Sequence, residues 1–152
     1  MRLYYLIGGL LRPMRLAYFY VYNVIFQTPR ARVLIWNEND EVLLVRNWAG
    51  QSYWALPGGG VKRKERPIGA AKRELYEELG LKLPLQEFVY VATLQDQYTA
   101  WIYTVTILKD DVSLTPHNPW EITDLQWFSP KKLPADLSPL VPHALMNLSK
   151  SD

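Results

Sequence analysis

The 152-residue sequence contains no cysteine and only two histidines, His117 and His143. The absence of cysteine excludes thiol catalysis, structural disulfides and thiolate metal sites, and two histidines are too few for a histidine-rich zinc centre. Any metal ion must therefore be held mostly by oxygen. With 49% hydrophobic and 21% charged residues, the composition also excludes a collagen-like or wholly disordered chain and fits one ordinary domain with a sizeable core.

Acidic residues are missing from the first 30 positions, which hold four arginines and so carry +4. The other 122 residues hold 13 Lys and Arg against 15 Asp and Glu, a net charge of −2. The mildly basic pI of about 8.8 therefore comes from the N-terminus, and no specific nucleic-acid partner is expected.

Residues 1–29, the N-terminal arm, hold seven of the chain's twenty aromatic residues. Its longest uncharged run, residues 16–29, has 14 residues, too few for a membrane-spanning helix of roughly 18 to 20, and no signal-peptide cleavage site follows it. A cytoplasmic location is expected. Gly8-Gly9 and Pro13 divide the arm into one or two short helices, which could pack on the domain, on a second copy as a homodimer, or on a bilayer surface. Packing on protein is favoured over peripheral membrane contact.

Residues 30–152 are expected to form a single α/β domain. Short β-branched and apolar runs separated by turn formers predict a hairpin over residues 33–36 and 42–45. A third extended piece is stopped by Pro57 and three glycines. The remaining elements are a helix over 66–79, strands over 88–94, 101–108 and 125–128, and a short helix around 141–149.

The helix over 66–79 is the segment that points to chemistry. Pro67 suits a first helical turn, Glu65 favours a helix N-terminus, and Gly80 stands where a left-handed cap belongs. At 100° per residue, three glutamates share an arc of about 100°, with an apolar stripe beside it and a fork-shaped cation on its other flank. The glutamates are Glu74, Glu77 and Glu78, the stripe is Ile68, Ala71, Leu75 and Leu79, and the cation is Arg73.

Three like charges on neighbouring turns repel one another, and a divalent cation would turn that repulsion into attraction. Mg²⁺ prefers a few carboxylates together with substrate phosphates, and the glycines upstream allow backbone groups to approach the same place. The alternative is an exposed acidic helix with no function. The spacing of the whole segment argues against this alternative.

Residues 59–81 resemble the Nudix box, in which glycine, glutamate, Arg-Glu, Glu-Glu and glycine recur at fixed spacing. The matches are Gly59, Glu65, Arg73-Glu74-Leu75, Glu77-Glu78 and Gly80-Leu81. Seven fixed matches have a chance probability on the order of 10⁻⁹ per starting position. The resemblance covers residues 31–135, and Lys64 departs from it, because many members carry glycine there. It implies a Nudix-type α/β/α sandwich with a mixed sheet.

The resemblance also implies an enzyme that uses Mg²⁺ or Mn²⁺ to hydrolyse a pyrophosphate bond. The substrate would be a nucleotide or a nucleoside diphosphate linked to another moiety, such as ADP-ribose, a nucleotide sugar or a nucleoside triphosphate. By resemblance, Glu77, Glu78 and the Gly58 carbonyl bind the metal, and Glu74 is a ligand or the base. Glu65 and Arg73 hold the loop and the helix in register.

Other residues are weaker candidates. Glu121 is the expected further carboxylate, with Asp96 as its competitor and a solvated loop acid as the alternative. A substrate base could stack on Trp48, Tyr53 or Tyr98, although such aromatics more often belong to the core or rim, and His117 is expected to be an ordinary loop residue. The competing hypotheses are a Nudix-fold nucleotide sensor without turnover and a membrane-surface anchor built on the arm.

Overall fold

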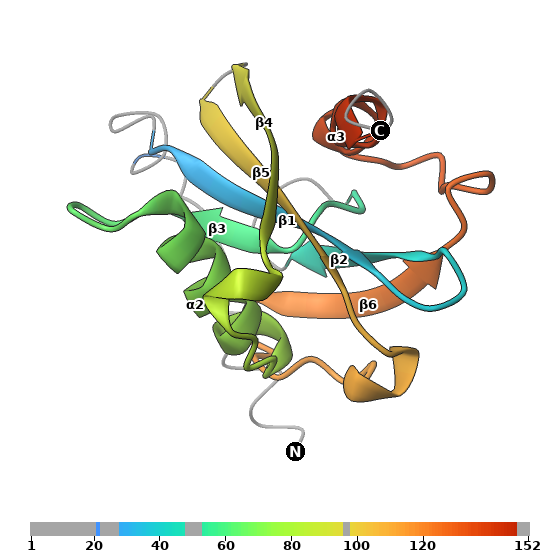
Figure 1. Ribbon diagram of the computed structural model, residues 1–152. Coiled ribbons are helices and arrows are strands. Elements are labelled where there is room, and N and C mark those ends of the chain that lie inside the picture. The colour runs from blue at the N-terminus through green and yellow to red at the C-terminus, as the bar shows by residue number, and fades with distance from the viewer. Residues whose placement is uncertain (1–20, 22–27, 48–52, 96–97, 149–152) are drawn as a thin grey trace.

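A six-stranded mixed sheet forms the centre of the fold (Figure 1). The computed structural model describes residues 21, 28–47, 53–95 and 98–148. The strands are β1 (Arg30–Trp36), β2 (Val42–Asn47), β3 (Gly58–Gly60), β4 (Val89–Gln95), β5 (Thr99–Thr106) and β6 (Ile122–Phe128). They run in the order β4-β5-β1-β2-β6, with β3 paired to β1 outside this path. Strands β1 and β5 are parallel and the other pairs are antiparallel.

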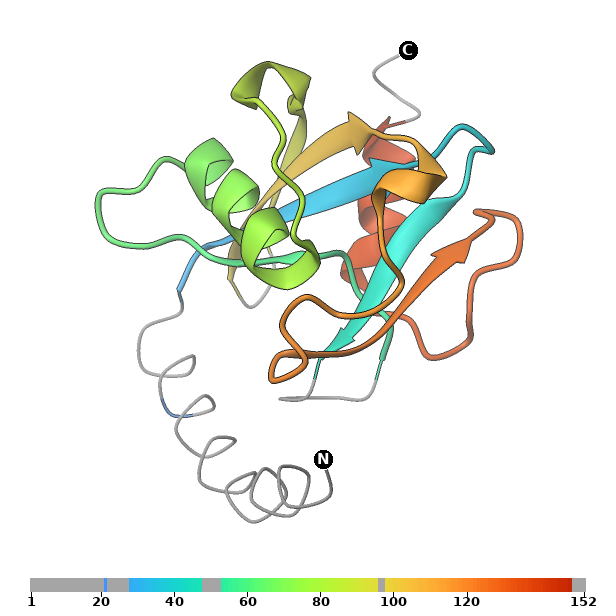
Figure 2. The ribbon, with the colours of Figure 1, turned by 90° about the horizontal axis from the view of Figure 1, so that it is seen from below.

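Two helices, α2 (Pro67–Leu79) and α3 (Leu140–Leu148), pack on opposite faces of this sheet (Figure 2). Side chains of β1 point alternately to the two faces of the sheet, so this strand contributes to the core under each helix. Ala31, Val33 and Ile35 belong to the core beneath α2, whereas Leu34 belongs to the core beneath α3. The α/β/α sandwich with a mixed sheet is therefore confirmed. Two short 3₁₀ turns, η1 (Leu85–Glu87) and η2 (Lys109–Asp111), complete the described elements.

The predicted hairpin and the later strands are confirmed within a few residues. Strands β1 and β2 pair with Trp36 opposite Val42, and the side-chain oxygen of Asn37 accepts hydrogen bonds from the amides of Asn39 and Glu41 to close the turn. Asp40 takes a left-handed φ of 55° there. The turn-forming residues between the two strands therefore predicted the position of this turn correctly.

The three glycines after Pro57 were predicted to end the extended piece in a turn, and this prediction is wrong because Gly58–Gly60 form strand β3. These residues pair with β1, with Gly58 opposite Arg32 and Gly60 opposite Arg30. The residues just before it, predicted as extended, make only isolated bridges, Val45 with Ala55 and Trp54 with Leu137. Glycine is needed in this strand because a side chain at Gly59 would put its Cβ 2.5–2.6 Å from the carboxyl atoms of Glu74.

Helix α2 begins and ends where the sequence predicts. Pro67 stands in the first turn, and Gly80 caps the C-terminus with φ of 72° while its amide donates to the Tyr76 carbonyl at 2.9 Å. Three residues of the apolar stripe are buried together with Ala70, and the fourth, Ile68, is partly buried against the same core. The unexpected member of the buried set is Glu78, a charged residue type that the stripe did not include.

The N-terminal arm, apart from Val21, Thr28 and Pro29, falls outside the described residues, so its packing stays a prediction. Of the helices that the structure describes, none combines the length and the apolar character needed to cross a bilayer.

Two glycines of the α2 region predict opposite effects of the same substitution. At Gly69 an added Cβ would meet only Glu65 Cγ, at 3.9 Å, so Gly69→Ala should stabilise the helix by about 0.5–1 kcal/mol. At Gly80, alanine would have to keep a positive φ and its Cβ would lie 3.2 Å from the His117 ring, so Gly80→Ala should destabilise by about 1–2 kcal/mol. Urea unfolding measures both; a loss of stability in Gly69→Ala would contradict this account.

Candidate active site

Arg73 is the centre of a charged network on α2. Its Nε and Nη2 donate to the two carboxylate oxygens of Glu65 at 2.9 and 3.0 Å, and Nη2 also donates to the Gly60 carbonyl at 2.9 Å. Its Nη1 donates to Glu74 at 2.6 Å and to Glu77 at 3.1 Å. The hydrogen bonds to Glu65 are the main reason that the pKa of Arg73 rises above its ordinary value. One guanidinium thus joins the loop, β3 and the helix.

Glu78 is the most deeply buried acid of this group, at 4% exposure. Its Oε2 accepts a hydrogen bond from the Gly58 amide at 2.8 Å. Burial raises the pKa of Glu78 to about 8, with Glu74 and Glu121 acting in the same direction and Arg32 opposing them. Without a cation beside it, this carboxyl therefore holds its proton at neutral pH.

Glu74 lies against the backbone of β3, with 12% of its side chain exposed. Burial raises its pKa, and the charges of Glu77 and Glu121 add to the rise, whereas the hydrogen bond from Arg73 lowers it. Glu77 is more open, with 43% of its side chain exposed. The helix therefore presents carboxylates at three depths, from solvent to core.

Glu121 reaches the same place from the loop before β6. Its amide donates to the Asn118 carbonyl at 3.0 Å, and the Asn118 side-chain amide donates to its carboxylate at 3.1 Å. Because its charge raises the pKa of both Glu74 and Glu78, it faces the acidic side of α2. The role of Glu121 as a further carboxylate stays a prediction. The competitor Asp96 lies outside the described residues.

Arg32 is a residue of this site that sequence reasoning missed. It is buried, and its Nη1 donates to the carbonyl of Leu56 at 3.0 Å and to that of Gly58. The Gly58 carbonyl, an expected metal ligand, therefore already has a cationic partner. The available signal was a charged residue between the apolar residues Ala31 and Val33, since the alternation of β1 turns Arg32 to the same side as the buried Leu34.

His117, expected as an ordinary loop residue, contacts the end of α2. Its amide donates to the Glu78 carbonyl at 3.2 Å, and its Nδ1 lies 3.3 Å from the Glu77 carbonyl oxygen. The last turn of a helix leaves such carbonyls without partners within the helix. His117 therefore fastens the loop that carries Glu121 to the helix that carries the other acids.

Tyr53 and Tyr98, two of the aromatic candidates, are linked to this network through Arg30. The Arg30 guanidinium stands 4.8 Å from the ring centroid of Tyr98, and Arg30 also interacts electrostatically with Tyr53 and Glu74. Trp48 falls outside the described residues. Stacking of a substrate base on Tyr53 or Tyr98 remains a prediction.

The acidic groups fit a hard divalent cation in chemical type and in charge. The side-chain donors are carboxylate oxygens, which Mg²⁺ and Mn²⁺ prefer, and burial raises the pKa of Glu74 and of Glu78 although Arg73 and Arg32 act against the rise. Among residues 28–47, 53–95 and 98–148, no three Asp, Glu or His side chains are already gathered as a ligand set. Arg73 draws Glu74 and Glu77 to itself, while Glu78 is held at Gly58.

Comparison with known proteins agrees with this geometry. The family model described as NUDIX domain matches residues 27–147. Diphosphoinositol polyphosphate phosphohydrolase 2 of Rattus norvegicus is 40% identical over 73 residues, which are 47% of this chain and 41% of that protein. Diphosphoinositol polyphosphate phosphohydrolase 3-alpha of Homo sapiens is 35% identical over 89 residues, 53% of this chain and 54% of that protein. The matches span about two fifths to one half of these curated relatives.

Solved structures share the fold. A MutT NUDIX hydrolase from Burkholderia pseudomallei superposes with a TM-score of 0.63 at 26% identity, covering 79% of this chain and 98% of that one. A putative nudix hydrolase family member from Chromobacterium violaceum gives a TM-score of 0.64 at 24% identity, covering 81% and 77%. At that identity the second likeness concerns the fold alone.

Burial of Glu78 predicts a pH-dependent stability of the metal-free protein. The folded pKa of about 8 lies above the ordinary value of 4.5, so the folded state binds more protons between these values and its stability falls as pH rises through this window. The loss should be on the order of 3–5 kcal/mol. Glu78→Gln, which cannot ionise, should escape it. Urea unfolding in EDTA at pH 5 and pH 8.5 measures the difference; a stability gap between variant and wild type that does not change with pH would contradict the assignment.

Proposed function

Because this chain belongs to the Nudix family, we propose that it is a pyrophosphohydrolase that uses Mg²⁺ or Mn²⁺ to cleave a phosphoanhydride bond. The bond would lie in a nucleotide or in a nucleoside diphosphate linked to another moiety. The observation that carries this proposal is the run of carboxylates Glu74, Glu77 and Glu78 on α2, two of them largely buried, with the charge of Glu121 acting on Glu74 and Glu78.

The chemistry needs this kind of site because the reacting group is itself anionic. A pyrophosphate brings at least two negative charges, and its hydrolysis depends mainly on positioning and on neutralising the oxygens around phosphorus. A bound divalent cation would supply that neutralisation and lower the pKa of water. The protein's own task is to hold the carboxylates, the water and the phosphates in place.

We assign the metal to Glu77, Glu78 and the Gly58 carbonyl, and we assign Glu74 to metal binding or to removal of the proton from the attacking water. The deep position of Glu78 and its bond to the Gly58 amide restrict its movement, which suits a ligand of fixed place. Glu77 is open enough to turn between Arg73 and a cation.

Arg73 and Glu65 are assigned a positioning role. The paired hydrogen bonds between them connect the loop after β3 to the middle of α2. The hydrogen bond from Arg73 to the Gly60 carbonyl fixes β3 against the same helix. Glu121, held by Asn118, would add a carboxylate from the loop before β6.

The relatives favour a second class of substrate. Two of them are named for diphosphoinositol polyphosphates and are 35–40% identical over about half of this chain. A diphosphate on an inositol ring offers the same phosphoanhydride as a nucleoside diphosphate derivative. Both classes therefore belong in one substrate panel.

Substitution of Glu78 tests the proposal. Glu78→Gln should lower turnover by about three orders of magnitude or more, because the amide cannot serve as an anionic ligand, while the fold remains intact. Turnover is measured with Mg²⁺ on ADP-ribose, a nucleotide sugar, a nucleoside triphosphate and a diphosphoinositol polyphosphate by separating and quantifying the phosphate-containing products. Circular dichroism reports the fold.

Glu87→Gln is the matched control, since Glu87 is an exposed glutamate of η1 and the same chemical change there should leave turnover unaltered. Near-normal turnover in Glu78→Gln would refute the ligand assignment. Tight nucleotide binding by the wild type without turnover of any substrate would favour a sensor over an enzyme.

A further inference from the structure

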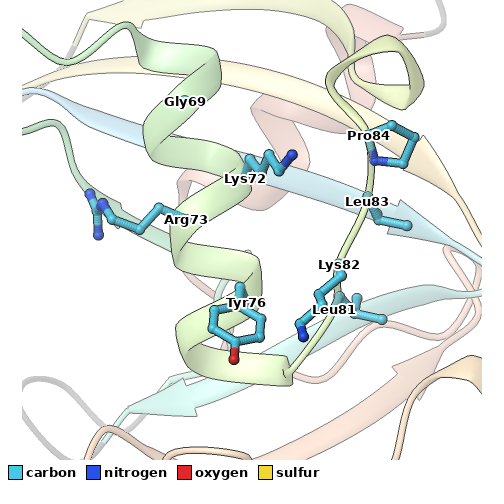
Figure 3. Close-up of a pocket in the computed structure, with 8 residues that line it drawn as sticks. All are labelled: Gly69, Lys72, Arg73, Tyr76, Leu81, Lys82, Leu83 and Pro84. Atoms are coloured by element: carbon cyan, nitrogen blue, oxygen red, sulfur yellow. The ribbon is translucent and has the colours of Figure 1, made fainter.

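A cavity of about 650 Å³ lies beside α2, between the helix and the segment that follows it (Figure 3). This volume is within the range of small-molecule sites. Eight residues line it: Gly69, Lys72, Arg73, Tyr76, Leu81, Lys82, Leu83 and Pro84.

The cavity is on the side of α2 away from the acidic residues. With Glu74 at zero, Lys72, Tyr76 and Gly69 fall at about 160°, 200° and 220° around the helix. Figure 3 shows the Arg73 guanidinium pointing away from the segment over 81–84, and it is fully engaged with the glutamates. Only the flank of Arg73 therefore borders the cavity, which is separate from the proposed active site.

Every charged residue that lines the cavity is positively charged. Lys72 and Lys82 extend into the space between the helix and the following segment, and the lining contains no Asp or Glu (Figure 3). Within the described part of the chain, neither ammonium group forms an ion pair. The Lys82 ammonium stands 5.2 Å from the Tyr76 ring centroid. Two ammonium groups thus face one hollow with no anion between them.

One wall of the cavity is apolar. Leu81, Leu83 and Pro84 form the side opposite the helix, and Tyr76 leaves 44% of its surface exposed. A bare ion would leave this wall in contact with water. A ligand that also carries an organic body would cover it.

Gly69 is a further indication. Glycine weakens a helix, and the fold does not need it here, since an added Cβ would touch only Glu65 Cγ at 3.9 Å. Gly69 does not have a positive φ, so its backbone conformation does not require glycine. The missing side chain instead keeps the upper end of the cavity open.

We propose that this cavity is a second ligand site, which binds an organic phosphate. A phosphate monoester carries a charge of about −1.5 to −2 at pH 7, which matches the two ammonium groups, whereas a carboxylate carries only one charge. The phosphate lies between Lys72 and Lys82, and the organic part lies against Leu83 and Pro84.

The test is a titration of the ¹⁵N-labelled full chain with AMP in EDTA, followed by NMR. We expect the amide signals of Gly69, Lys72 and Leu83 to shift on binding. The double variant Lys72→Gln/Lys82→Gln should weaken this binding at least tenfold. Lys131→Gln/Lys132→Gln removes the same charge from exposed positions after β6 and should change it less than twofold.

Two further arms examine the parts of the ligand. Gly69→Leu should weaken AMP binding by filling the cavity, and the lysine variant keeps the test valid if this variant does not fold. Inorganic phosphate should bind at least tenfold more weakly than AMP, because it cannot cover the apolar wall. Shifts confined to Gly59 and Glu121, equal losses in both double variants, or equal affinity for phosphate and AMP would overturn the proposal.

Discussion

The contact between the backbone of β3 and the carboxylates of α2 is the constraint on which the site depends. The Gly58 amide binds Glu78, and Gly59 leaves room for Glu74 where any Cβ would collide with it. Burial of Ala71, Leu75 and Leu79 presses the helix onto the sheet and brings these acids to the strand. The hydrophobic core therefore buries charge that it would otherwise exclude, and an unpaired buried carboxylate is costly.

Burial of the acids, which two arginines only partly offset, explains what the site would accept. Arg73 donates hydrogen bonds to Glu65, Glu74 and Glu77. Arg32 donates to two backbone carbonyls, and its charge also lowers the pKa of Glu78. Burial nevertheless keeps the pKa of Glu74 and of Glu78 above the ordinary value. A divalent cation and an anionic substrate can enter together, because each offsets the charge of the other.

Much of this fold could be predicted from sequence because local patterns determine it. The apolar stripe, Pro67 and Gly80 predicted α2, and the turn around Asn37 predicted the hairpin. The strand at Gly58–Gly60 and the roles of Arg32 and His117 could not be predicted, since each depends on a partner distant in sequence. For the same reason the box spacing indicated that Glu78 matters but not that it is buried. Lys64 shows a third case: the departure from glycine was visible, and the residue takes a left-handed φ of 65°.

The central claim is that the acidic side of α2 needs a divalent cation, and thermal unfolding with and without Mg²⁺ tests it most directly. A ligand that binds only the folded state raises the unfolding temperature, and the rise depends on its affinity. The account predicts a clear rise for the wild type and for Glu87→Gln, and a much smaller one for Glu78→Gln. An equal rise in all three proteins would contradict it.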